Sequence, residues 1–252
     1  PKLKTPEAFR KNTASLGIDL PCDDHVLPAA ESPLSTPLDI IKLNGKTAGN
    51  RIAIHPMEGW DGTKTGGVTK EMKRRWQRFG MSGAKLILGG EAMAVRHDGR
   101  ANPNQLIISN ENKSEIAGLL ELLLDSHQEK YDTTEDLVVG FQLTHSGRFC
   151  RPNEHSQFEP RVAYRHPILD SKFKVTSDKQ LWTDDEIDEL IQCYIRAARI
   201  AADIGADFVD IKHCHGYLLH EFLGAHTRPG RYGGSFENRT RILSQIINGI
   251  RS

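Results

Sequence analysis

The chain has 252 residues, of which 38% are hydrophobic and 26% are charged, a size and composition that suit one large globular domain or two small ones. Its 33 Lys and Arg residues balance 33 Asp and Glu residues, so no excess positive charge attracts nucleic acid or an anionic membrane. The apolar runs are too short to span a membrane, and residues 1–20 lack the apolar core of a signal peptide. We therefore expect a cytoplasmic protein with neither nucleic-acid nor membrane partners.

The cysteines are scattered and form no C-x-x-C pair, which predicts free thiols in a reducing compartment. Residues 1–36 are rich in proline, serine and charge and show weak periodicity. We expect these residues to form an N-terminal arm that packs outside the domain or is partly disordered. Next, the runs 38–43 and 50–54 flank Asn44-Gly45, a pair typical of a hairpin turn, and predict a hairpin that leads into a first buried strand.

Helical and strand patterns then alternate along the chain. Short apolar runs predict three further buried strands, over residues 84–88, 137–143 and 208–211. Apolar residues at a period of 3.6 predict four helices, over residues 70–79, 112–128 and 236–250 and from a capping box at Thr183–Glu186 to Gly205.

Four β-then-α units predict a parallel sheet covered by helices, in either a doubly wound sheet or a barrel. No G-x-G-x-x-G follows the first strand, which removes the usual dinucleotide fingerprint. Polar residues instead follow the strands, where a barrel places its active site; these are His55, Glu91, His145 and His215. The sequence thus favours an α/β fold of the (β/α)8 TIM-barrel type. Only its first four β/α units lie in this chain, over residues 37–252.

Four segments carry a more specific signal by their order and spacing. They are Asn50–Met57, Gln142–Arg148, Asp210–Leu218 and Tyr232–Arg239. Together they resemble the first four β/α units of the Old Yellow Enzyme-like NADH:flavin oxidoreductase family, and the resemblance covers roughly residues 38–252. The resemblance implies an FMN-binding TIM barrel that uses NADH or NADPH to reduce an electron-poor alkene, a small-molecule substrate.

The resemblance also assigns catalytic roles. In such a site two donors hold the substrate carbonyl oxygen, and a tyrosine delivers a proton to the α-carbon. The donors map to Lys212 and His215, and the proton donor maps to Tyr217. Lys212 stands where relatives carry histidine, so a substrate with a carboxylate would suit it. Alternatively, we expect the Lys212 ammonium to form an ion pair with the carboxylate of Asp210.

The resemblance places the flavin against the turn after the first strand and against the next two strands. Relatives donate to flavin O4 from the position of Glu58, whose other interpretation is an outward-facing loop acid. Trp60 is either an aromatic residue over the substrate pocket or a core anchor. The residues expected to bind the cofactor are His55, Pro56, Met57, Glu58, Ala92 and Gln142.

Several alternatives stay open. Branches of the same family act on dienoyl thioesters or amines. The elements that hold the flavin phosphate in the family are expected beyond residue 252. One alternative is therefore a half-barrel without activity. Because unpaired edge strands aggregate, a half-barrel is also expected to pair with the missing half or to form a homo-oligomer. His213 and His215 form an H-x-H pair that binds zinc in some barrels, a minor alternative to a site without metal.

Overall fold

The computed structural model describes residues 2–252, except for the side chains of residues 40–43 and 89–90. The strands are β1 (Leu38–Leu43), β2 (Lys46–Ala48), β3 (Ala53–Ile54), β4 (Leu86–Ala94), β5 (Val138–Thr144) and β6 (Phe208–Ile211). The α-helices are α1 (Pro6–Ser15), α2 (Lys70–Met81), α3 (Lys113–Tyr131), α4 (Leu169–Phe173), α5 (Asp184–Asp203), α6 (Leu218–Leu223) and α7 (Phe236–Arg251). Short 3-10 turns occupy Pro33–Ser35, His97–Gly99, Gly147–Phe149 and Asp178–Gln180.

The main sheet has the order β3-β4-β5-β6, and each strand pairs in parallel with the next one along the chain. A doubly wound sheet reverses its strand order at a switch point, whereas a barrel adds its strands in sequence. The observed order is therefore that of the first four strands of a barrel, and the predicted fold class is confirmed.

The hairpin prediction agrees with the structure. Strands β1 and β2 pair antiparallel, and Asn44 and Gly45 between them have φ values of 51° and 77°. Positive φ at both positions is the conformation that an Asn-Gly turn favours. The first strand of the main sheet is shorter than expected, because β3 covers two residues and Ala53 is exposed. The prediction of a buried strand here is wrong, since β3 is an edge strand with one paired side.

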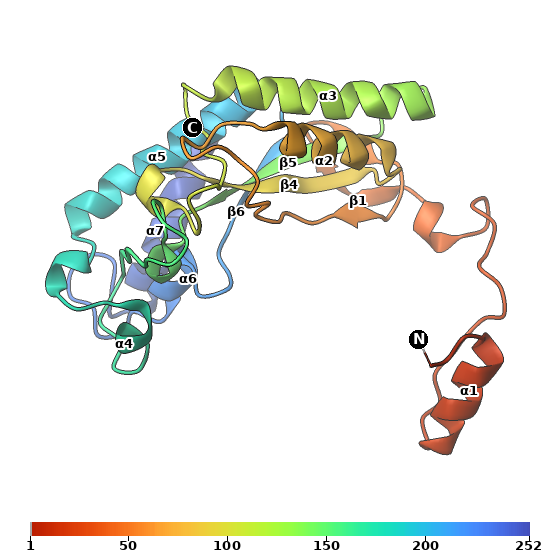
Figure 1. The fold of residues 1–252 in the computed structure, drawn as a ribbon, viewed down its shortest axis with the longest axis horizontal. Coiled ribbons are helices and arrows are strands. Elements are labelled where there is room, and N and C mark those ends of the chain that lie inside the picture. Colours follow the sequence, from red (N-terminus) through yellow and green to blue (C-terminus); the bar gives the residue numbers. More distant parts are fainter. Residues whose placement is uncertain (1) are drawn as a thin grey trace.

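Helices α2 and α3 lie together on one side of β4 and β5 (Figure 1). Thr69 caps α2 by accepting a hydrogen bond from the backbone N–H of Met72, and α2 buries Met72, Trp76 and Gly80 along one face. A Cβ atom at Gly80 would lie 2.2 Å from the Leu123 carbonyl oxygen of α3. Glycine at this position therefore allows the two helices to pack closely.

Helix α5 begins as predicted. The Thr183 hydroxyl accepts from the Glu186 backbone N–H, and the Glu186 carboxylate accepts in return from the Thr183 backbone N–H. Helix α7 packs against α5, and both contribute to one core with the outward face of the sheet. In the arm, α1 stands apart from the rest of the chain (Figure 1).

Candidate active site at the carboxyl ends of the strands

A row of three residues crosses the inward face of the sheet. Ala92 of β4 is in register with Gln142 of β5, which is in register with Asp210 of β6. The neighbouring residues Phe141 and Val209 pack into the core on the opposite face, as strand alternation requires. Gln142 Nε2 donates a hydrogen bond of 2.6 Å to Asp210 Oδ2. The row thus presents a small side chain, an amide and a carboxylate side by side.

Lys212 follows Asp210 by two residues and therefore lies on the same side of the chain. Its backbone N–H donates to the Leu143 carbonyl, which continues the ladder one residue beyond β6. The Lys212 side chain is only 9% exposed, and its Nζ lies 3.4 Å from Glu58 Oε1. The sequence offered Asp210 as a partner for Lys212, but Asp210 accepts from Gln142 and Lys212 contacts Glu58, which was not foreseen.

Glu58 also reaches Tyr217. The tyrosine hydroxyl donates to Glu58 Oε2 at 3.2 Å, and Lys212 Nζ lies 4.2 Å from the centre of the tyrosine ring. The side chain of Glu58 is 10% exposed, so its interpretation as an outward-facing loop acid is wrong. We call Glu58, Lys212 and Tyr217 the Glu58 cluster. It joins the turn after β3 to the turn after β6, at the two edges of the sheet.

The Tyr217 hydroxyl is held in its protonated form. Burial raises the pKa of Tyr217 well above its ordinary value, and the negative charge of Glu58 beside it raises the pKa further. A tyrosine that stays protonated through the neutral range can act as a proton donor. The donor role is thus compatible with the surroundings of this side chain.

The turn that carries Glu58 is fixed by a second set of contacts, which sequence reasoning missed. The backbone N–H of Gly59 donates to Glu91 Oε1 at 3.0 Å, and Arg75 bridges Glu91 Oε2 and Asp61 Oδ1 at 2.5 and 2.8 Å. Burial raises the pKa of Glu91 to about 7, against the opposing charge of Arg75.

Glu91 was expected beyond the end of a strand that closes at Gly89-Gly90, yet β4 continues to Ala94. The strand prediction is therefore wrong at this end. The pairing of β4 with β5 shifts register between Gly89 and Ala92, so the strand passes through the glycine pair as an irregularity. The polar signal of Glu91 was visible in the sequence, but its ion pair with Arg75 depends on the packing of α2.

Trp60 takes a φ of 55°, an uncommon conformation for a bulky residue. Its side chain is 51% exposed and stacks on the ring of His155 with 5.7 Å between ring centres. The core-anchor interpretation of Trp60 is therefore wrong. Trp60 follows Gly59, whose backbone N–H donates to Glu91. The indole lies at the surface, two positions along the chain from Glu58.

The remaining predicted site residues lie near the Glu58 cluster along the chain, and they differ in their burial and contacts. His55 and Met57 are exposed beside Glu58, and Pro56 is half-buried. His215 is exposed with a φ of 61°, and it forms no hydrogen bond or ion pair with any residue that the structure describes. The structure brings Lys212 and Tyr217 together but not His215, and the catalytic roles of all three residues stay predictions.

The inward row has the donor set that a flavin pyrimidine edge requires. That edge presents an N–H group between two carbonyl oxygens, and an amide can both donate to it and accept from it. In the described part of the chain, Gln142 Oε1 receives no hydrogen bond, so it can accept one. The small side chain of Ala92 allows a planar ring to approach the strand. These residues fit FMN.

Two histidines that form the H-x-H pair do not gather further ligands. Within residues 2–252, His, Cys, Asp and Glu side chains form no group of three or more that could hold a metal ion. Burial lowers the pKa of His213, which is half-buried.

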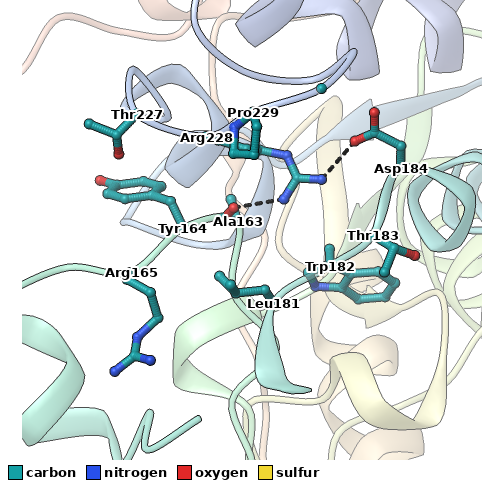
Figure 2. A pocket seen from close by; sticks show the side chains of 11 residues that line it. Ala163, Tyr164, Arg165, Leu181, Trp182, Thr183, Asp184, Thr227, Arg228 and Pro229 are labelled. Carbon is teal, nitrogen blue, oxygen red and sulfur yellow. Dashed lines mark hydrogen bonds and ion pairs between the residues drawn. The ribbon is translucent and has the colours of Figure 1, made fainter. Parts of the chain in front are cut away.

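A separate cavity of about 470 Å³ lies away from the Glu58 cluster, between residues 163–165, 181–184 and 227–230 (Figure 2). The Arg228 guanidinium lies at this cavity and donates to the Ala163 carbonyl at 2.9 Å and to Asp184 Oδ1 at 2.8 Å. None of the predicted site residues lines this cavity. Its observed contacts tie the segment before α7 to the start of α5.

The strand order defines the first part of a TIM-type barrel, and comparison with known proteins gives its family. Residues 34–252 match the family model described as NADH:flavin oxidoreductase / NADH oxidase family. The chain belongs to this family. Its members use FMN as cofactor and NADH or NADPH as electron donor.

Two similar relatives are NADPH dehydrogenases. The one from Geobacillus sp. (strain WCH70) is 33% identical over 214 residues, which are 83% of this chain and 57% of the relative. The one from Clostridium acetobutylicum is 32% identical over 204 residues, 80% of this chain and 56% of the relative. The chain thus spans little more than half the length of these relatives.

Solved structures agree on the fold. Old Yellow Enzyme from Pichia sp. AKU4542 superposes with a TM-score of 0.70 at 23% identity, covering 88% of this chain and 57% of that one. The Old Yellow Enzyme homologue from Zymomonas mobilis has a TM-score of 0.67 at 25% identity, covering 87% and 59%. Within residues 2–252, no helix is both long and apolar enough to cross a membrane.

Proposed function

We propose that this protein is an FMN-dependent oxidoreductase that uses NADH or NADPH to reduce the activated C=C bond of a small electron-poor alkene. The observation that carries the proposal is the Glu58 cluster, in which a buried ammonium and a protonated tyrosine meet, two residues along the chain from the Asp210 end of the inward row. Ala92 and Gln142 would hold FMN, which in its reduced form would supply the hydride to the β-carbon. The side chains of this chain supply polarisation and the proton.

In this proposal Lys212 stabilises the negative charge that develops on the substrate carbonyl oxygen. An ammonium donor in a site that excludes water acts more strongly than in solution. The contact with Glu58 restricts the conformations of the flexible Lys212 side chain and so positions its ammonium group. His215 is proposed as the second donor, three residues further along the turn.

Tyr217 is proposed as the proton donor to the α-carbon. Its hydroxyl is protonated and buried against Glu58, and its ring packs on Phe149 with 5.6 Å between ring centres. Both contacts fix the position of the hydroxyl, whose O–H would turn from Glu58 to the substrate to deliver the proton. Proton transfer by a positioned side chain contributes about 10²–10⁴-fold to rate.

For the cofactor, Gln142 is proposed to bind the pyrimidine edge and Ala92 to lie against the ring. The turn His55-Pro56-Met57-Glu58 is proposed to line the flavin with its backbone, and Trp60 to border the substrate. We also propose a division into an arm, residues 1–36, and the first half of the barrel, residues 37–252. The start of the family match at residue 34 supports this boundary.

The test separates the two half-reactions. In the FMN-loaded protein, NADPH or NADH should bleach the flavin absorption without oxygen, and 2-cyclohexenone should restore it. Tyr217→Phe should leave the bleaching step unchanged and slow reoxidation by cyclohexenone by about 10²-fold or more, because only the second step needs the proton. Tyr131→Phe, on α3, serves as a matched control and should slow neither step. If cyclohexenone does not reoxidise the reduced wild-type protein, the proposal is wrong.

A further inference from the structure

The positive charge of Lys212 in the candidate site is matched by the carboxylate of Glu58. Lys212 is the one ammonium in the Glu58 cluster, and its charge is matched by Glu58 at 3.4 Å. The next ionisable group along the inward row is Asp210, which adds a negative charge shared with the Gln142 amide. The group formed by these residues therefore has no surplus positive charge to offer an anion.

The pair is also largely removed from water. The side chains of Lys212 and Glu58 are 9% and 10% exposed, so their interaction is screened less than that of a surface pair. Glu58 has its two oxygens on different partners, one on Lys212 and one on Tyr217. An anionic substrate that approached Lys212 would have to compete with a carboxylate already in place.

We propose that Glu58 is a specificity-determining residue that makes the site accept uncharged substrates and reject those with a carboxylate near the reacting bond. This inference rests on the proposed function and adds to it the charge class of the substrate. It replaces the expectation, drawn from Lys212 alone, that an anionic substrate suits the site. Discrimination of this kind works by an unfavourable contact with the wrong ligand.

The same carboxylate positions the two proposed catalytic groups. Its bonds hold Lys212 Nζ over the face of the Tyr217 ring, at 4.2 Å from the ring centre. The amide of glutamine could keep a hydrogen bond to Tyr217 and would lose the charge. Glu58→Gln thus separates the charge of this residue from its shape.

Benzamide and benzoate are suitable probes because they share a ring and differ mainly in charge. Their binding to the FMN-loaded protein is measured by the change in flavin absorption. The wild-type protein should bind benzamide better than benzoate. Glu58→Gln should strengthen benzoate binding by about tenfold, the size of effect that removing one nearby charge produces, and change benzamide binding by less than about twofold. The exposed Glu129→Gln on α3 is the matched control and should leave both affinities as they are.

A second variant guards against misfolding of the first. Lys212→Met leaves Glu58 without its cation, so relative to the wild type benzoate should lose more affinity than benzamide, which loses only the Lys212 hydrogen bond. Equal binding of both probes to the wild type, or an unchanged benzoate-to-benzamide ratio in Glu58→Gln and Lys212→Met, overturns the inference. Those results leave flavin reduction by NAD(P)H intact. A protein that binds no FMN instead overturns the proposed function, and the inference with it.

Discussion

Single residues in this protein are placed by burial as much as by hydrogen bonding. His145 follows β5, and its side chain is fully buried, with the ring edge-on to Trp182 at 5.2 Å between centres. Its Nδ1 accepts a hydrogen bond from the Gly147 backbone at 3.1 Å. Burial lowers the pKa of His145, and the nearby carboxylate of Asp98 only partly opposes this effect. The sequence placed His145 at the active-site end of the strands, whereas its buried side chain packs against the loop residue Trp182.

The titration of His145 follows from this environment. The unfolded chain takes up this proton near pH 6.5, whereas the folded chain does not, so below about pH 6.5 the residue lowers the free energy of unfolding as pH falls. In NMR titrations the His145 ring should titrate below about pH 6.5, the ordinary value for histidine. His145→Asn should make stability less dependent on pH between 5 and 6.5. A His145 midpoint at or above about pH 6.5 would contradict the account.

Contacts at the ends of helices and strands position these elements relative to one another. Thr183 starts α5 and is itself exposed, so its contribution comes from the cap and not from packing. The adjacent Asp184 accepts from Arg228 (Figure 2) and from the backbone of Arg231, which attaches the segment before α7 to the same end of α5. One helix start thus joins two β/α units. The Glu58 cluster does the same for the turns after β3 and β6.

Removal of the cap measures this effect. Thr183→Ala should lower the free energy of unfolding by about 1 kcal/mol, because the Glu186 backbone N–H loses its partner. Thr240→Ala, within α7, removes only a hydroxyl bonded to a helical carbonyl and should change stability by less than about 0.5 kcal/mol. Urea denaturation of both variants gives the comparison. Equal losses in the two variants would show that the cap does not stabilise α5.

The sequence predicted the regular elements well and their surroundings less well. The range of β6 and the start of α5 agree with the structure, because apolar periodicity and capping chemistry are local signals. The segment between β5 and α5 carried no such pattern, and α4 there was not foreseen. Lys212 and Tyr217 were found by resemblance. Their contact with Glu58 spans more than 150 positions in the chain and could not be read from either motif.

At the scale of the molecule, the sheet is open on both sides. Within residues 2–252, strand β3 pairs only with β4, and β6 only with β5. A cavity of about 400 Å³ lies beside Phe208 and Val209 of β6, between α5 and α7. We propose that further barrel strands pair with β3 and β6, either from more of the same polypeptide or from a second copy, because bare parallel edges are prone to aggregate.

The central claim is that residues 37–252 carry the ring-binding face of a flavin barrel, and the most direct test is FMN binding by the folded protein. Titration with FMN, followed by the visible absorption of the flavin, should give a saturable spectral shift, as expected for a ring that leaves water for the Ala92–Gln142 row. A folded protein that carries no flavin and produces no shift on addition of FMN would contradict the claim.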